Sequence, residues 1–100
     1  MDPNFAKVTG FDWNSGNSSK SLTKHRVSTQ EAEQVFADPN VHVLDDVAHS
    51  ASEPRWKVYG KTPASRFIAV SFTIRGSLVR VISARPMNRT ERKVYEKASA

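Results

Sequence analysis

Residues 68–96 read IAVSFTIRGSLVRVISARPMNRTERKVYE, and they predict two strands, a tight turn and a closing helix. Apolar side chains alternate with small or polar ones from residue 68 to residue 75, which is the period-2 pattern of a half-buried strand. Gly76 and Ser77 interrupt this pattern, and the second strand is expected from residue 78 to about residue 85. Because glycine adopts a positive φ at no steric cost, these two residues suit a two-residue hairpin turn.

This turn also predicts the register of the hairpin. Three cross-strand pairs are expected, namely Ile74 with Val79, Phe72 with Val81 and Thr73 with Arg80. A shift by one residue would move the apolar side chains to the polar face, so the pattern specifies the register strongly. Arg80 then lies in mid-strand on the more polar face, far from a loop tip, and we expect it to meet an anionic partner.

A helix is predicted directly after the hairpin. Pro86 ends the second strand because it has no N–H to donate to the ladder. Asn88 is a suitable N-cap for a helix over residues 89–97, with Glu91 in the capping-box position. Cationic side chains gather at this junction: Arg85, Arg89, Arg92 and Lys93.

The chain before residue 28 predicts one strand and one helix. Residues 8–13 are expected to form a first or edge strand, and residues 14–17 a turn. A helix then opens at Ser18 or Ser19. It ends in basic residues, which suit the negative end of the helix dipole: Lys24, His25 and Arg26.

A second helix and two short strands are predicted between this helix and the hairpin. Ser28 and Glu31 have the spacing of a capping box, and the helix that follows stops at Asp38-Pro39. Its apolar stripe is narrow: Ala32, Val35 and Phe36. The two strands lie on either side of an acidic connector, at residues 41–44 and 55–60.

The predicted fold class is α+β, an antiparallel sheet with two N-terminal helices and a C-terminal helix. With 100 residues the chain is expected to be one domain at residues 8–100, preceded by a leader at residues 1–7. No apolar run approaches the roughly 20 residues of a membrane helix, and there is no hydrophobic signal region, so a cytoplasmic protein without a membrane partner is expected.

Charge and composition restrict the class of partner. The net charge is +5, which favours a polyanion such as nucleic acid, or an acidic protein. The absence of cysteine excludes disulfides and thiolate metal sites. Asp45, Asp46, His42 and His49 lack any known metal-binding spacing and are interpreted as a solvated acidic loop, so no metal or cofactor is expected.

A metal-free phosphodiester site is the chemistry that remains. RNA carries its own nucleophile, the 2′-OH, so cleavage needs a base, cations at the phosphate and an acid for the leaving oxygen. Arginine suits the phosphate and histidine titrates near neutrality, so the candidate catalytic residues are His25, Arg80 and Arg85. His25 is otherwise a helix cap, and Tyr95 is either a proton donor, a stacking surface or a core aromatic.

The combined motifs resemble those of the BrnT toxins of bacterial type II toxin–antitoxin systems. The resemblance covers almost the whole chain after the leader. The stretches that carry it are Phe11-Asp12-Trp13, Lys24-His25, Val27-Ser28, Glu31-Ala32, Val35-Phe36, Asp38-Pro39, Arg55 with Gly60, residues 80–85 (RVISAR), and Glu91-Arg92 with Tyr95.

This resemblance implies a RelE-like fold and a ribonuclease that inhibits translation. It also implies a cognate BrnA-like antitoxin that wraps the toxin, and operator DNA that is bound only through the toxin–antitoxin complex. The implied site contains His25, Arg80 and Arg85. The cations expected to bind RNA around it are Lys24, Arg55, Lys57, Arg75 and Arg89.

The chain departs from the family pattern in and around the first helix. Asn14 replaces an aspartate, Asn17 a lysine, Ser21 an asparagine and Arg26 a glycine. Arg26 gives up the positive φ that glycine adopts easily. These departures keep a second hypothesis open, in which the chain is a non-catalytic module of the same fold that binds RNA or a partner protein.

Overall fold

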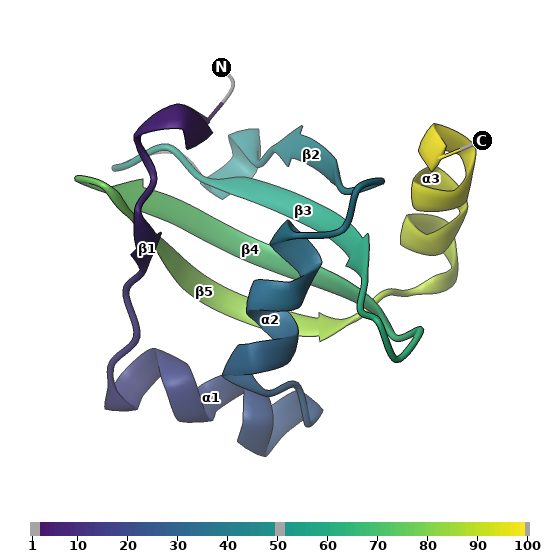
Figure 1. Cartoon of the computed structure of the whole chain (residues 1–100), viewed down its shortest axis with the longest axis horizontal. Helices are drawn as coiled ribbons and strands as arrows, with labels where there is room; N and C mark the ends of the chain where they lie inside the picture. The colour runs from purple at the N-terminus through teal and green to yellow at the C-terminus, as the bar shows by residue number, and fades with distance from the viewer. Residues whose placement is uncertain (1–2, 50–51, 100) are drawn as a thin grey trace.

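A five-stranded β-sheet with the order β1-β5-β4-β3-β2 forms the centre of the structure (Figure 1). The computed structural model describes residues 3–49 and 52–99. The strands are β1 (Gly10–Phe11), β2 (His42–Asp45), β3 (Trp56–Lys61), β4 (Phe67–Arg75) and β5 (Leu78–Pro86). The helices are α1 (Ser15–His25), α2 (Thr29–Phe36), α3 (Arg89–Ser99) and two 3₁₀ turns, η1 (Phe5–Lys7) and η2 (Val47–His49). The fold is therefore α+β with a five-stranded sheet and three α-helices.

The sheet is mixed, so the expectation of an entirely antiparallel sheet is wrong at one edge. β1 runs parallel to β5, with Gly10 opposite Leu78 and Phe11 opposite Val79. The other neighbouring pairs are antiparallel. Every other strand lies between β1 and β5 in the chain, so no hairpin imposes an antiparallel direction on this pair.

The central hairpin has the predicted register. Phe72 pairs with Val81 and Thr73 with Arg80, and Gly76 in the turn has a φ of 62°. A β-bulge that the alternation did not predict follows, because Ser71 pairs with Ser83 and leaves Ile82 as an extra residue in β5.

The bulge changes which side chains of β5 share a face. A regular strand places residues an odd number apart on opposite faces, which would separate Arg80 from Arg85. The extra residue at Ile82 shifts the alternation, so that Val81 and Ala84 both face the core. Arg80 and Arg85 therefore lie on the same face of the sheet.

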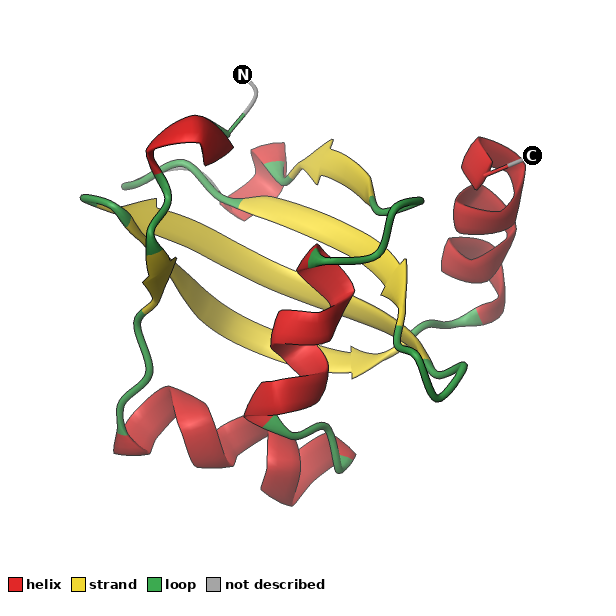
Figure 2. Cartoon of the chain, viewed as in Figure 1, coloured by secondary structure: helices red, strands yellow, loops and turns green. Residues whose placement is uncertain are grey.

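The two faces of the sheet have different coverings (Figures 1 and 2). One face carries the main core, and α2 packs on it; its largest fully buried side chains include Ile68, Val58, Val70 and Phe72. On the opposite face a smaller cluster joins Tyr95 of α3 to Tyr59 and Ala69. α3 packs against β3 at this end, and within residues 3–49 and 52–99 much of the second face has no helix over it.

The end of α2 is fixed by a network that explains two of the motif residues. The Asp38 carboxylate accepts hydrogen bonds from the Tyr95 hydroxyl (2.6 Å) and from the Lys61 backbone N–H (2.8 Å). A Cβ on Gly60 would lie 2.7 Å from Cγ1 of Val35, so only glycine lets α2 approach β3 this closely. Tyr95 is thus a core aromatic with a satisfied hydroxyl.

The helix caps agree with the sequence analysis except at α1. Ser28 with Glu31, and Asn88 with Glu91, form the predicted reciprocal hydrogen bonds. The predicted start of the first helix at residue 18 or 19 is wrong, because α1 begins at Ser15. The side chain of Asn14 accepts hydrogen bonds from the backbone N–H groups of residues 16 and 17, which caps the helix earlier than the turn pattern suggested.

Two peripheral segments pack more closely than expected. Phe5 in the expected leader stacks on Phe72, with ring centroids 5.9 Å apart. Asp46 is only 8% exposed and its backbone N–H donates to the carbonyl of Arg55, so the interpretation as a solvated loop is wrong for this residue. Among the described residues, no helix has the length and apolar character needed to cross a membrane.

Candidate functional site

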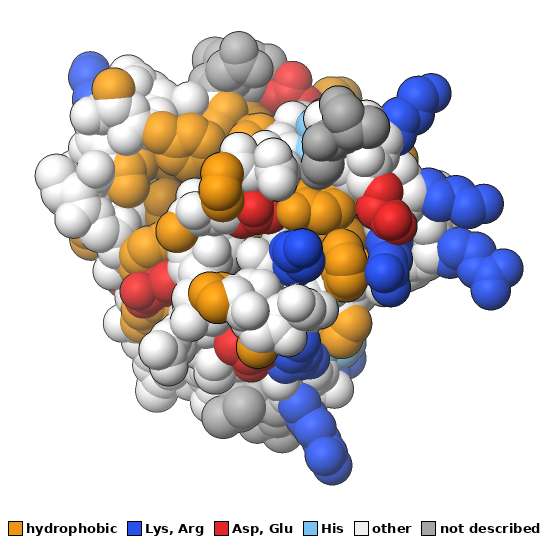
Figure 3. Space-filling model, turned by 45° about the vertical axis from the view of Figure 1, so that its right-hand side comes forward, with side chains coloured by type: hydrophobic (Ala, Val, Ile, Leu, Met, Phe, Trp, Pro, Cys, Tyr) orange, Lys and Arg blue, Asp and Glu red, His pale blue; other side chains and the backbone are white. Residues whose placement is uncertain are grey.

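The uncovered face of the sheet carries most of the predicted cations. Residues directly opposite one another in a sheet share a face. Three rows of paired residues lie on this face: Lys57 with Ser71 and Ser83, Thr73 with Arg80, and Ala69 with Arg85. Arg55, directly before β3, and Arg75, at the end of β4, continue the same alternation. Exposed cations of α3 add to the positive charge of the molecule: Arg89, Arg92, Lys93 and Lys97. Figure 3 shows Lys and Arg side chains gathered on the right-hand side of the view.

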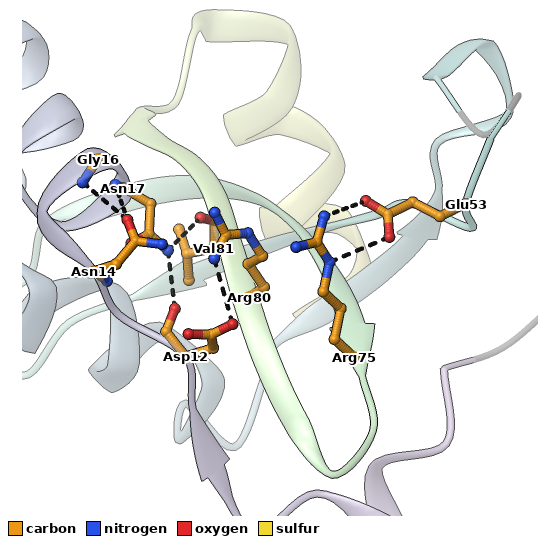
Figure 4. Close-up of polar contacts among 8 residues, drawn as sticks. All are labelled: Asp12, Asn14, Gly16, Asn17, Glu53, Arg75, Arg80 and Val81. Carbon is orange, nitrogen blue, oxygen red and sulfur yellow. Dashed lines mark hydrogen bonds and ion pairs between the residues drawn. The ribbon is translucent and has the colours of Figure 1, made fainter.

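A hollow of about 280 Å³ on this face brings three arginines together. Its lining residues are Gly16, Asn17, Glu53, Arg55, Arg75, Arg80, Val81 and Ile82. The first two come from the start of α1, and the others from β4, β5 and the segment that leads into β3 (Figure 4). Three fixed positive charges beside the positive end of a helix dipole make the hollow suitable for a phosphate group.

Two carboxylates neutralise part of this charge. The Asp12 carboxylate lies 3.3 Å from Nη1 of Arg80, and Oε1 of Glu53 lies 3.1 Å from Nη2 of Arg75 (Figure 4). The hydrogen bond from Arg75 is the main reason why the pKa of Glu53 lies below its usual value, and the charges of Arg75, Arg55 and Arg80 lower it further. Glu53 is therefore ionised at neutral pH, and Arg80 has the anionic partner that its mid-strand position predicted.

Asn17 fixes the start of α1 against the strand that carries Arg80. Its side-chain amide donates to the carbonyls of Asp12 (2.9 Å) and Val81 (3.1 Å), and the residue is only 9% exposed. The departure from the family's lysine thus replaces a cation with a structural anchor. β1 pairs with only two residues of β5, and after these two residues α1 packs directly against β5 through this anchor.

Arg85 lies on the same face but outside the hollow. Its guanidinium donates to both oxygens of Glu91, at 2.6 and 2.7 Å. This bond is the main cause that lowers the pKa of Glu91, while burial followed by the Glu91 charge raises the pKa of Tyr59. The partners of Arg80 and Arg85 on β4 are four residues apart, which is about 13 Å along the strand, and Glu91 holds the Arg85 guanidinium outside the hollow that Arg80 lines.

The structure places the remaining predicted residues away from the hollow. Lys24 and His25 are at the C-terminal end of α1, seven and eight residues beyond Asn17 and therefore roughly 10–12 Å further along the helix axis. Arg89 is exposed at the first position of α3. Lys57 lies on the same face between the rows of Arg80 and Arg85.

The sequence analysis missed both carboxylates of the site. Asp12 was identified only as part of the motif Phe11-Asp12-Trp13 and was given no role, and Glu53 lies in a connector with no periodic pattern. Asp12 reaches Arg80 because β1 pairs with β5, which is distant in the chain, and Glu53 reaches Arg75 because the segment before β3 lies beside the end of β4. No spacing in the sequence indicates either contact.

A larger hollow, of about 430 Å³, lies on the other side of the sheet and has an apolar lining. It includes Phe5, Phe11, Phe36 and Val41, and Glu33 is the one charged residue among the described residues that line it. Without a cation it offers nothing to a phosphate. The basic hollow is therefore the better candidate for chemistry on a nucleic acid.

Comparison with known proteins identifies the family. The family model described as "Ribonuclease toxin, BrnT, of type II toxin-antitoxin system" matches residues 13–91. None of the curated proteins searched matches the chain. The match covers α1, α2, β2 to β5 and the start of α3, and includes the three arginines of the hollow. The chain therefore belongs to the BrnT family of ribonuclease toxins of type II toxin–antitoxin systems.

Proposed function

We propose that this chain is a metal-independent endoribonuclease that inhibits translation and is neutralised by a cognate antitoxin. One observation carries the proposal: a chain of a ribonuclease family has Arg55, Arg75 and Arg80 around one hollow on the sheet face opposite α2. RNA is the expected substrate, and the hollow is the expected position of the scissile phosphate.

The proposed reaction uses the 2′-OH of RNA as nucleophile. Arg80 and Arg55 bind the non-bridging oxygens of the phosphate, where negative charge increases in the transition state. Guanidinium groups suit this role because they are permanently charged and donate two parallel hydrogen bonds. The products are a 2′,3′-cyclic phosphate and a 5′-hydroxyl, and no step requires a metal ion.

The non-catalytic module remains the second candidate, and the position of His25 favours it. His25 is the one histidine among the predicted catalytic residues, and it lies outside the hollow. In this alternative the same arginines bind RNA phosphates or an acidic partner without cleaving anything.

The remaining parts of the proposal concern fold type, partner and place of action. We assign the sheet and its helices to the RelE-like type. The antitoxin is BrnA-like and covers the basic face, and operator DNA is bound only by the toxin–antitoxin complex. The toxin acts in the cytoplasm, where its RNA targets are.

The test is an RNA cleavage assay with purified protein in excess EDTA. Arg80→Ala is expected to lower the cleavage rate by about 10²-fold or more, since it removes a donor to the developing charge. Lys97→Ala, at an exposed position in the last turn of α3, is the control that removes one positive charge elsewhere and leaves the rate unchanged. Circular dichroism must show that both variants are folded.

Three results separate the candidates. Cleavage by the wild type that is lost in Arg80→Ala supports the ribonuclease. RNA binding without cleavage, on free RNA and with ribosomes, supports the non-catalytic module. Cleavage that stops in EDTA and returns with a divalent ion contradicts the metal-independent mechanism.

A further inference from the structure

The hollow contains a candidate for the proton acceptor that the reaction needs. Among the described residues that line it, Glu53 is the one side chain that is a base at neutral pH. The three arginines stay protonated, and the amide of Asn17 is neutral. We propose that Glu53 is the general base that takes the proton from the 2′-OH of RNA; this inference rests on the proposed ribonuclease function.

The geometry around Glu53 favours this role. Arg75 holds its carboxylate through two contacts, Nη2 to Oε1 at 3.1 Å and Nε to Oε2 at 3.4 Å. In Figure 4 the Arg75 guanidinium lies between this carboxylate and the guanidinium of Arg80. The Glu53 side chain is 30% exposed, so its carboxylate is fixed in place and still accessible to a ligand.

Asp12 is the other carboxylate near the arginines, and it fits a positioning role better. It contacts Arg80 but does not line the hollow, and in Figure 4 it lies on the opposite side of Arg80 from Glu53. A phosphate bound in this hollow by Arg80 and Arg55 lies beside Glu53, because all three side chains line the hollow. Asp12 then fixes the position of the Arg80 guanidinium and does not contact the phosphate.

The step balances with the groups named. The 2′-OH proton moves to the Glu53 carboxylate as the 2′-oxygen forms a bond to phosphorus. The bond from phosphorus to the 5′-oxygen breaks, and the leaving oxygen takes a proton from water. The hydroxide that remains takes the proton from Glu53, which restores water and the carboxylate. Three cations keep Glu53 ionised and ready to accept a proton, although they also make it a weaker base.

The test compares Glu53→Gln with Glu53→Asp in the EDTA assay. Gln keeps the size of the side chain and an acceptor for Arg75 but is not a base, so kcat is expected to fall by about 10²–10⁴-fold. KM and RNA affinity stay within a few-fold of wild type, because the arginines are unchanged. Asp keeps a carboxylate and restores part of the rate. Glu96→Gln, on the exposed surface of α3, is the control for the change in net charge.

A pH profile tests the assignment without any substitution. If Glu53 is the base, its lowered pKa keeps it ionised between pH 5 and 7, so its titration does not change kcat/KM of the wild type in this range. A base whose side chain titrates near neutrality would instead make kcat/KM rise with pH through about 6.5.

The outcomes separate this inference from the proposed function. If Glu53→Gln cleaves RNA as fast as the wild type, Glu53 is not the general base, and the proposed ribonuclease function is unaffected. The same conclusion follows if kcat/KM of the wild type rises with pH through about 6.5. A Glu53→Gln variant that loses RNA binding together with cleavage shows a structural role and overturns the inference. No cleavage by the wild type overturns both.

Discussion

Arg26→Gly is expected to stabilise the protein, because Arg26 adopts a conformation that suits glycine. Arg26 follows the last residue of α1 and has a φ of 55°, in the left-handed region. A residue with a Cβ pays about 1–2 kcal/mol there relative to glycine. Glycine also increases the entropy of the unfolded chain, which lowers the free energy of unfolding by about 0.4–1 kcal/mol and offsets part of this gain.

The net expectation is a free energy of unfolding that rises by about 0.5–1 kcal/mol. For a domain of this size that corresponds to an increase in Tm of about 2–8 °C. The hydrogen bond between Nη1 of Arg66 and the carbonyl of Arg26 (2.9 Å) uses only the backbone of residue 26, so the substitution keeps it. The Arg26 side chain is exposed, and its loss costs little.

Urea unfolding followed by circular dichroism measures this change. Arg26→Ala is the matched control: it removes the same side chain and charge but keeps the Cβ, so its stability stays within about 0.5 kcal/mol of wild type. An Arg26→Gly variant that is no more stable than Arg26→Ala refutes the strain at this position.

Three further substitutions test the packing that supports the site. Tyr95→Phe removes the hydroxyl that donates to Asp38 and is expected to cost about 1.5–3 kcal/mol in urea unfolding; a cost near zero contradicts this network. Gly60→Ala places a Cβ against Val35 and is expected to cost about 1–3 kcal/mol by the same measurement, with an unchanged free energy of unfolding as the opposing result. The folded-state pKa of Glu91 is lowered, so its contribution to stability is complete above the unfolded value near 4.5 and is lost as pH falls through the folded pKa. Below about pH 5 the free energy of unfolding should therefore fall less steeply with decreasing pH in Glu91→Gln than in the wild type. An equal dependence on pH in the two proteins would contradict a lowered pKa of Glu91.

The sequence predicted the elements with strong local signals. The register of the hairpin followed from alternation on both sides of Gly76, and the caps at Ser28 and Asn88 followed from side chains that bond to their own backbone. These are short-range effects, so a single sequence is enough to predict them.

The parts that were missed depend on contacts between distant segments. The parallel pairing of β1 brings Asp12 to Arg80 across 68 residues, and no periodic pattern carries that information. The bulge at Ile82 changes the face of Arg85, although two successive apolar residues, Val81 and Ile82, are a weak sign of it. His25 and Arg85 were grouped with Arg80 by residue type and by the family resemblance, neither of which gives a distance, and the structure places both outside the hollow.

The most direct test of the account asks whether the 2′-OH of RNA is the nucleophile in the absence of metal. The wild type is incubated in EDTA with an RNA of mapped cleavage site, and with the same RNA carrying a single 2′-deoxyribose at the nucleotide that precedes the cut. The account predicts 2′,3′-cyclic phosphate and 5′-hydroxyl ends from the first RNA and no cut at that position in the second. Cleavage of the deoxy-substituted position, or 5′-phosphate ends, would contradict it.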